Sequence, residues 1–298
     1  GSARFPSPFY RKRTTMIQKR VKTVVERVDQ KPFLIDSYIN LDKADHPLII
    51  FCHGYKGYKD WGGWTLMAME FVKAGFAFVK FNFSHNGGTM DNPIDFPDLE
   101  AFGNNNYTIE LNDLGDVIDW AILKFKDNAH VNTGQLILMG HSRGGGMVVL
   151  KAAEDPRIKK VITLAGVSDY KSRFPKGADF DKWKENGVGY VKNGRTLQDM
   201  PHYFQYYENF IANEKRLTIS SAAKTLSCPF LIIQGTEDEA VKPIEAERLH
   251  QWSCHSQLKW IEGANHVFGM KQPWEQDELP EAMNLVIRKC FKFLQEPS

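Results

Sequence analysis

The amino-acid sequence predicts an α/β protein built on a mostly parallel β-sheet with helices on both faces. Short β-rich runs alternate with amphipathic helical runs through most of the chain, a pattern typical of such a sheet. A glycine-flanked serine, Ser142, follows an apolar run and precedes a helix-compatible one, so a strand is expected to pass directly into a helix there. The alternation stops between residues 168 and 226, which predicts an inserted segment.

The first half of the chain supplies the opening strands and two long helices. Residues 22–28 and 33–40 are expected to pair, with the turn at residues 29–32. One helix is expected over residues 64–74, ended by Gly75, and another over residues 108–126, whose apolar residues share one face. The remaining strands expected before Ser142 cover residues 47–52, 76–83 and 135–139.

The second half resumes the same rhythm around the insertion. A helix at residues 147–153, strands at 160–164, 229–233 and 257–261, and helices at 243–252 and 280–294 are expected there. The insertion is rich in aromatic residues, which suits a folded lid over a ligand. Within it we expect helices at 179–186 and 202–213 and a hairpin at 187–196 that turns around Asn193 and Gly194.

Composition limits the possible partners and cofactors. The net charge of +2, without a basic stripe, argues against nucleic-acid binding, and no apolar run is long enough to span a bilayer. Residues 1–15 show no signal peptide and are expected to be a tag or disordered leader, so a cytoplasmic location is expected. The four cysteines are expected to be free thiols, and Cys254 with His250 and His255 lacks a second ligand group. We therefore expect neither a metal nor a cofactor.

Ser142 has the surroundings of a nucleophile. Gly140 and Gly144 flank it, and glycine is the residue that fits a sharp turn pressed against neighbouring backbone. The first amides of the following helix have no intrahelical partner and suit a developing negative charge. A serine hydroxyl needs a base within hydrogen-bond reach and a third group to orient that base.

Two later loops can supply the acid and the base. Residues 234–241 follow the strand expected at 229–233 and contain Asp238 between Glu237 and Glu239. Residues 263–268 follow the strand expected at 257–261 and contain His266. Because the carboxyl ends of parallel strands meet at one edge of the sheet, both loops are expected near Ser142.

These motifs resemble those of α/β-hydrolases, whose chain order is serine, acid, histidine. Residues 140–144 look like the nucleophile elbow of that family, 235–241 are similar to its G-x-x-D-x-x-V acid loop, and 263–268 to its G-A-x-H-x-F loop. The resemblance implies an eight-stranded sheet with a cap insertion after the sixth strand. The core would be residues 16–167 and 227–298, and the cap residues 168–226. It also implies that Ser142 is the nucleophile, Asp238 the acid and His266 the base.

Several residues near this triad have more than one interpretation. Glu237 and Glu239 are expected to be solvated, because the family spacing selects Asp238. His53, His85 and His141 could also face the site; His141 is expected to be structural, whereas His85 either lines the pocket or is simply exposed.

The oxyanion site is expected to use main-chain amides. Residues 53–57 resemble the H-G-x-x-G turn of the family, so the backbone N–H groups of Tyr55 and Arg143 are the expected donors. The Arg143 side chain could bind a substrate carboxylate or pair with a core acid on a neighbouring helix, and we favour the pairing.

The cap and the loops resemble those of bacterial carboxylesterases of the cinnamoyl or feruloyl esterase type and their dienelactone-hydrolase-like relatives. This resemblance implies hydrolysis of a small-molecule carboxylic ester, with activity that rises with pH as His266 becomes neutral. Trp183 and Tyr207 join His85 as possible pocket residues. A serine peptidase or amidase with the same triad and a non-catalytic binding protein of the same fold are the alternatives, and the oligomeric state stays open.

Overall fold

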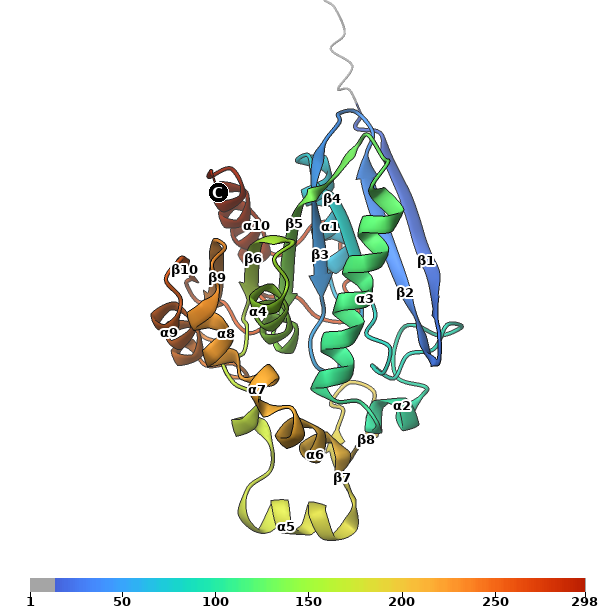
Figure 1. The fold of residues 1–298 in the computed structure, drawn as a ribbon, viewed down its shortest axis with the longest axis vertical. Coiled ribbons are helices and arrows are strands. Elements are labelled where there is room, and N and C mark those ends of the chain that lie inside the picture. The colour runs from blue at the N-terminus through green and yellow to red at the C-terminus, as the bar shows by residue number, and fades with distance from the viewer. Residues whose placement is uncertain (1–13, 298) are drawn as a thin grey trace, which may run out of the picture.

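The central β-sheet has eight strands and confirms the predicted α/β arrangement. The computed structural model describes residues 14–297, so the expected leader at residues 1–15 lies outside the described residues except for Thr14 and Thr15. Across the sheet the strands follow the order β1-β2-β4-β3-β5-β6-β9-β10 (Figure 1). Their bounds are β1 Ile17–Arg27, β2 Gln30–Asn40, β3 His46–Cys52, β4 Ala77–Phe81, β5 Val131–His141, β6 Ile158–Leu164, β9 Phe230–Gly235 and β10 Ser256–Ile261.

The strands from β4 to β10 in this order are all parallel, and β1 and β2 form an antiparallel edge. Successive side chains of a strand point to opposite faces, so an apolar strand feeds two cores. In β3, Leu48 and Ile50 belong to the core on one face, whereas Ile49 and Phe51 belong to the core on the other. Such strands require cover on both faces.

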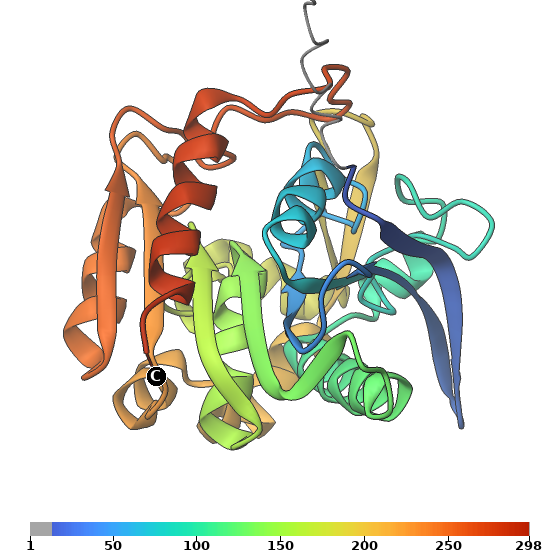
Figure 2. The same ribbon diagram turned by 90° about the horizontal axis from the view of Figure 1, so that it is seen from above.

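Helices provide that cover on the two faces of the sheet. Helices α1 and α10 pack on one face, and α3, α4, α8 and α9 pack on the other (Figure 2). The short helix α2, which the sequence did not predict, is capped by the Asp98 carboxylate. The bounds are α1 Trp64–Lys73, α2 Leu99–Gly103, α3 Tyr107–Phe125, α4 Arg143–Glu154, α8 Ile219–Thr225, α9 Pro243–Trp252 and α10 Glu281–Leu294.

Helix α4 begins at Arg143, four residues earlier than the sequence predicted. Three glycines, Gly144 to Gly146, lie in its first turn despite the low helix propensity of glycine. A Cβ atom at Gly145 would come within 2.7 Å of the Gly166 Cα. Close packing of α4 against the loop after β6 therefore requires glycine at position 145, within the first turn of the helix.

Residues 168–226, called here the cap segment, follow β6 and return to the sheet at β9. Figure 1 shows α5, α6 and the two strands of this segment gathered at one end of the molecule. Strands β7 and β8 form a separate two-stranded antiparallel sheet. The elements before α8 are a 3-10 turn η1 at Lys171–Arg173, α5 Gly177–Asn186, β7 Val188–Lys192, β8 Asp199–Tyr203, α6 Gln205–Ala212 and α7 Glu214–Leu217.

The hairpin of the cap segment is longer than the expected one at residues 187–196. Its strands pair from Val188 with Tyr203 to Lys192 with Asp199, so residues 202 and 203 are extended and the helix expected from residue 202 starts at Gln205. The Asn193 side chain accepts the amide hydrogens of Arg195 and Thr196. This local bonding stabilises a six-residue loop, 193–198, in place of a tight turn at Asn193 and Gly194.

Candidate active site

Ser142 occupies a strained turn between β5 and α4. Its backbone has φ 57° and ψ −118°, a conformation that non-glycine residues rarely adopt. A Cβ atom at Gly140 would collide with the Gly144 carbonyl, and one at Gly144 would collide with the carbonyl oxygens of Cys52 and His53. The turn thus requires both glycines and projects the serine hydroxyl beyond the end of the strand.

The structure brings Ser142, His266 and Asp238 together. His266 Nε2 lies 3.0 Å from Ser142 Oγ, and His266 Nδ1 lies 2.8 Å from Asp238 Oδ2. The Asp238 side chain is fully buried, and its other oxygen accepts the amide hydrogens of Ala240 and Val241 at 2.9 Å. Burial raises the pKa of the Asp238 carboxyl, but the bonds from His266 and these amides bring it below its ordinary value.

The alternative acids and histidines lie in different surroundings. Glu237 and Glu239 are exposed on either side of the buried Asp238. His141 is buried and donates from Nε2 to the His266 carbonyl oxygen at 2.9 Å, so it supports the loop that carries His266. His53 is also buried; its Nε2 accepts the Phe83 amide hydrogen, and its Nδ1 donates to the Gly54 carbonyl.

Arg143 directly follows Ser142, and the loop that carries Tyr55 lies against the Ser142 turn. Arg143 is the first residue of α4, so its N–H has no acceptor within the helix. A Cβ atom at Gly54 would approach within 3.1 Å of both the Ser142 Cβ and the His141 carbonyl oxygen. Glycine at this position lets the loop that carries Tyr55 reach the Ser142 turn.

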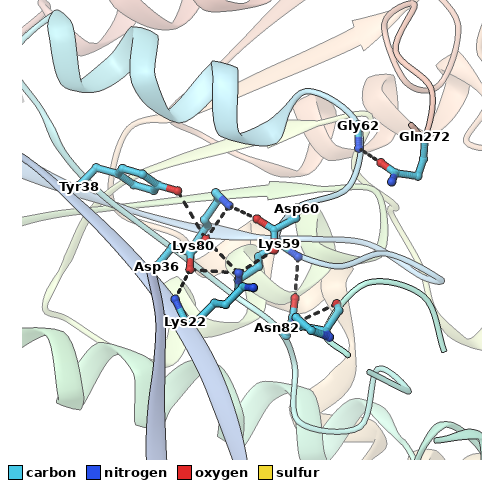
Figure 3. Close-up of polar contacts among 10 residues, drawn as sticks. Lys22, Asp36, Tyr38, Lys59, Asp60, Gly62, Lys80, Asn82 and Gln272 are labelled. Carbon is cyan, nitrogen blue, oxygen red and sulfur yellow. Dashed lines mark hydrogen bonds and ion pairs between the residues drawn. The ribbon is translucent and has the colours of Figure 1, made fainter. Parts of the chain in front are cut away.

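A buried cluster of charges anchors the loop after β3, residues 53–63 (Figure 3). Lys80 on β4 and Lys59 of the loop both bind the Asp36 carboxylate on β2, with Nζ to oxygen distances of 2.8 and 3.0 Å. The Asp60 carboxylate of the loop accepts from Lys59 Nζ at 2.6 Å and from Lys80 Nζ at 3.0 Å. The Lys59 amide also donates to Asn82 Oδ1 at 2.6 Å. Two lysines and two aspartates thus hold the loop to the sheet.

The four charges balance in this cluster, and three of the side chains are almost fully buried. Lys59, Lys80 and Asp36 each expose 1% or less of their side chains. Burial raises the pKa of the Asp60 carboxyl, but the two lysine ammonium groups bring it below its ordinary value. Sequence reasoning missed this cluster; Lys80, within the apolar run of residues 76–83, was the available signal.

A cavity of about 10 Å³ lies between the loop after β3, α3 and the cap segment. Its lining includes Tyr55, Asn105, Glu110, Arg143, His202 and Tyr206. The residues expected in the pocket, His85, Trp183 and Tyr207, are not among those that line it.

The three expected pocket residues have other neighbours instead. Trp183 packs against Phe204 within the cap segment and donates from its indole N–H to the His202 carbonyl. Tyr207 contacts the Phe180 ring, also within the cap segment. His85 is half-buried and bonds to the Ser84 hydroxyl at 2.8 Å. The cap aromatics therefore form much of the core of the cap segment itself.

The Arg143 side chain pairs with a core acid, as favoured from the sequence. Its Nε donates to Glu110 Oε1 on α3 at 2.5 Å, and both side chains are buried. The guanidinium carbon lies 4.3 Å from the centre of the Tyr107 ring and 5.3 Å from that of Tyr206. Such stacking favours a buried cation.

Residues 14–297 contain neither a metal-binding group of side chains nor a membrane-spanning helix. Within residues 14–297, no group of three His, Cys, Asp or Glu side chains is arranged to hold a metal ion. No helix in these residues is long and apolar enough to cross a membrane. All four cysteines are free thiols, and Cys52 and Cys290 are buried.

Known proteins resemble this chain in sequence and in fold. The model of the prolyl oligopeptidase family matches residues 70–285. An uncharacterized 31.7 kDa protein of the traX-finO intergenic region of Escherichia coli is 29% identical over 130 residues. That match covers 42% of this chain and 38% of the relative, so the chain spans well under two thirds of the curated relatives it matches.

Two solved structures share the fold over nearly the whole chain. Est1E from Butyrivibrio proteoclasticus has a TM-score of 0.65 at 16% identity and covers 93% of this chain and 100% of its own. Alpha/beta hydrolase domain-containing protein 10 from mouse has a TM-score of 0.64 at 17% identity, covering 92% and 98%. The family match spans more than half of the chain and includes Ser142, Asp238 and His266, so the chain belongs to the prolyl oligopeptidase family and is a hydrolase of the α/β-hydrolase type.

Proposed function

We propose that the protein is a serine carboxylesterase that works through an acyl-enzyme intermediate. The observation that carries the proposal is the continuous chain of contacts from Ser142 through His266 to Asp238, with distances of 3.0 and 2.8 Å. A histidine between a serine hydroxyl and a buried carboxylate can remove the hydroxyl proton and keep the correct tautomer while it does so.

The proposed reaction has two steps. His266 takes the proton of Ser142 as Oγ bonds to the ester carbonyl carbon, and then gives that proton to the departing alcohol. A water molecule, deprotonated by His266, attacks the acyl-enzyme, and the acid leaves as Ser142 regains its proton. The backbone N–H groups of Tyr55 and Arg143 stabilise the oxyanion in both steps, and loss of one such donor typically costs about 3 kcal/mol of barrier.

Two further observations support an ester as substrate and a cap over the site. Est1E, which shares the fold, has also been solved with ferulic acid bound, at a TM-score of 0.63 and 18% identity. His202 and Tyr206 of the cap segment line the cavity beside Tyr55 and Arg143. We therefore assign residues 168–226 as a cap over the site.

The test is ester hydrolysis by the wild-type protein and a Ser142→Ala variant. With p-nitrophenyl butyrate, kcat should fall by roughly 10³-fold or more in the variant. A fluorophosphonate probe should label the wild-type protein and leave the variant unlabelled. Ser172→Ala, which alters an exposed serine of the cap segment, is the matched control and should behave as wild type. Full turnover by Ser142→Ala would exclude the proposed mechanism.

A serine peptidase or amidase is the second candidate, because the matching family is named for a peptidase. It requires the same triad, and it predicts efficient cleavage of aminoacyl p-nitroanilides. An esterase predicts that the p-nitrophenyl ester of the same acyl group is cleaved far faster than its anilide. Absence of both turnover and probe labelling would instead favour a non-catalytic binding protein of this fold.

A further inference from the structure

Three residues that line the cavity beside Tyr55 and Arg143 each have one buried polar atom without a hydrogen-bond partner among the described residues. Arg143 Nη2, Asn105 Oδ1 and His202 Nδ1 are buried and make no hydrogen bond to any of the residues 14–297. Arg143 and Asn105 are each more than nine-tenths buried. Buried polar groups in folded proteins are nearly always hydrogen-bonded, so three unsatisfied ones on residues that line one small cavity indicate a site that a ligand completes.

The Arg143 guanidinium is fixed in place and its charge is balanced. Its Nε is held by Glu110 at 2.5 Å, and the Tyr107 and Tyr206 rings stack against it. Nη2 is therefore a donor with a set direction and no local freedom to find another acceptor. The charges of the Arg143 guanidinium and the Glu110 carboxylate cancel, so this side of the cavity has little net charge.

Asn105 and His202 complete the lining with an acceptor and a neutral ring. Asn105 Oδ1 is a buried acceptor that receives no hydrogen bond from the described residues. His202 Nε2 and the Tyr55 hydroxyl lie 2.7 Å apart, so only Nδ1 is free. Burial, with Arg143 and Lys56 nearby, lowers the pKa of His202 to about 3, so the ring is neutral at physiological pH.

These atoms fit a hydroxyl group better than a carboxylate. A hydroxyl oxygen can accept a hydrogen bond from Arg143 Nη2 and donate one to Asn105 Oδ1. A carboxylate could satisfy Arg143, but it would face the Asn105 oxygen and lie near the buried Glu110 carboxylate. The volume of about 10 Å³ also suits one oxygen-sized group.

The cavity adjoins the reacting serine through two of its lining residues. Gly54, whose added Cβ would lie 3.1 Å from the Ser142 Cβ, borders the cavity, and Arg143 directly follows Ser142. We infer that the cavity is a subsite for a hydroxyl group on the acyl part of the substrate, close to the scissile carbonyl. The inference rests on the proposed esterase function and narrows its substrates to short hydroxyacyl esters.

The kinetic test compares p-nitrophenyl esters of 2- and 3-hydroxybutyrate with p-nitrophenyl butyrate. For at least one hydroxyl position, kcat/KM should exceed that of the butyrate ester by about 10-fold or more, the factor that corresponds to 1.4 kcal/mol. The p-nitrophenyl monoester of succinate tests the anionic alternative, because Lys56 also lines the cavity. A succinate ester favoured over both hydroxyacyl esters would overturn the inference.

Asn105→Ala and Asn104→Ala form a matched pair of variants. Asn105→Ala removes the acceptor, so the hydroxyl preference, which is the ratio of kcat/KM for the hydroxyacyl ester to kcat/KM for the butyrate ester, should fall to about 2-fold or less. Asn104 is the exposed neighbour, and its alanine variant should keep the full preference. Equal preference in wild type and Asn105→Ala would overturn the role of this cavity.

A binding measurement separates failure of the subsite from failure of the esterase proposal. The Ser142→Ala variant is titrated with ethyl 2-hydroxybutyrate, ethyl 3-hydroxybutyrate and ethyl butyrate and followed by NMR chemical shifts. Binding of one hydroxyacyl ester at least 5-fold tighter than the butyrate ester supports the subsite even if the wild-type protein turns over none of the three. Equal Kd values would overturn it, whatever the outcome for Ser142 turnover.

Discussion

Substitution of Asp36 by asparagine should strongly destabilise the fold. Asparagine keeps the size of the side chain and removes the negative charge that Lys59 and Lys80 share at 3.0 and 2.8 Å. Lys80 has no exposed side-chain surface and Lys59 exposes 1%, so neither ammonium can regain water without local unfolding. Only Asp60 would remain to balance two buried cations.

The expected loss in the free energy of unfolding follows from this geometry. Removal of one partner from a buried ion pair costs about 3–5 kcal/mol, because it leaves an uncompensated buried charge. A double variant, Asp36→Asn with Lys80→Met, removes one charge of each sign. Its loss should be smaller than the sum of the two single losses by about 0.5–3 kcal/mol, the usual range for directly coupled residues.

Urea unfolding followed by tryptophan fluorescence measures these differences, and circular dichroism checks that the transition is two-state. Asp119→Asn is the matched control, since the Asp119 side chain is 65% exposed in its pair with Arg157. An exposed ion pair contributes little to stability, so the free energy of unfolding of Asp119→Asn should stay within about 0.5 kcal/mol of the wild-type value. If Asp36→Asn lost less than about 1 kcal/mol, or if the two single losses simply added, the reasoning would be refuted.

Three further predictions concern the Ser142 turn, the acid and a buried histidine. Gly144→Ala should fail to fold or lose several kcal/mol of stability, whereas Gly115→Ala, which meets only the flexible Lys151 terminus, should be neutral or stabilising in the same urea assay. Asp238→Asn should lower kcat by roughly 10³–10⁴-fold, and the variant should still unfold in one cooperative transition. An unaltered kcat would contradict the proposed role of Asp238. Burial lowers the pKa of His141 to about 3, so the unfolded chain binds a proton below about pH 6.5 that the folded state does not. Stability should therefore fall from pH 6.5 to 5, and a His141→Asn variant should show a slope smaller by up to about 1.4 kcal/mol per pH unit.

The sequence alone predicted the fold class and the meeting of Ser142, Asp238 and His266 at one edge of the sheet. Strands that are buried on both faces appear in the sequence as continuous apolar runs, so they can be recognised from a few neighbouring residues. The residues that carry the chemistry follow strand ends, and parallel strands bring their carboxyl ends to one edge, so Ser142, Asp238 and His266 could be placed together. Their catalytic roles stay predictions until the variants are measured.

Only the tertiary structure decided which side chains meet in the buried charge cluster and in the cap segment. Asp36, Lys59 and Lys80 come from separate segments, and no local pattern indicates that their charges meet. Within the cap segment, aromatic composition predicted a folded unit but not which rings pack together, and Trp183 and Tyr207 are not among the residues that line the cavity beside Arg143. Hydrophobic periodicity indicates which face of a helix or strand is apolar. Which polar side chains pair with each other depends on how distant segments of the backbone approach. The ion pair between Glu110 on α3 and Arg143 on α4 is an example.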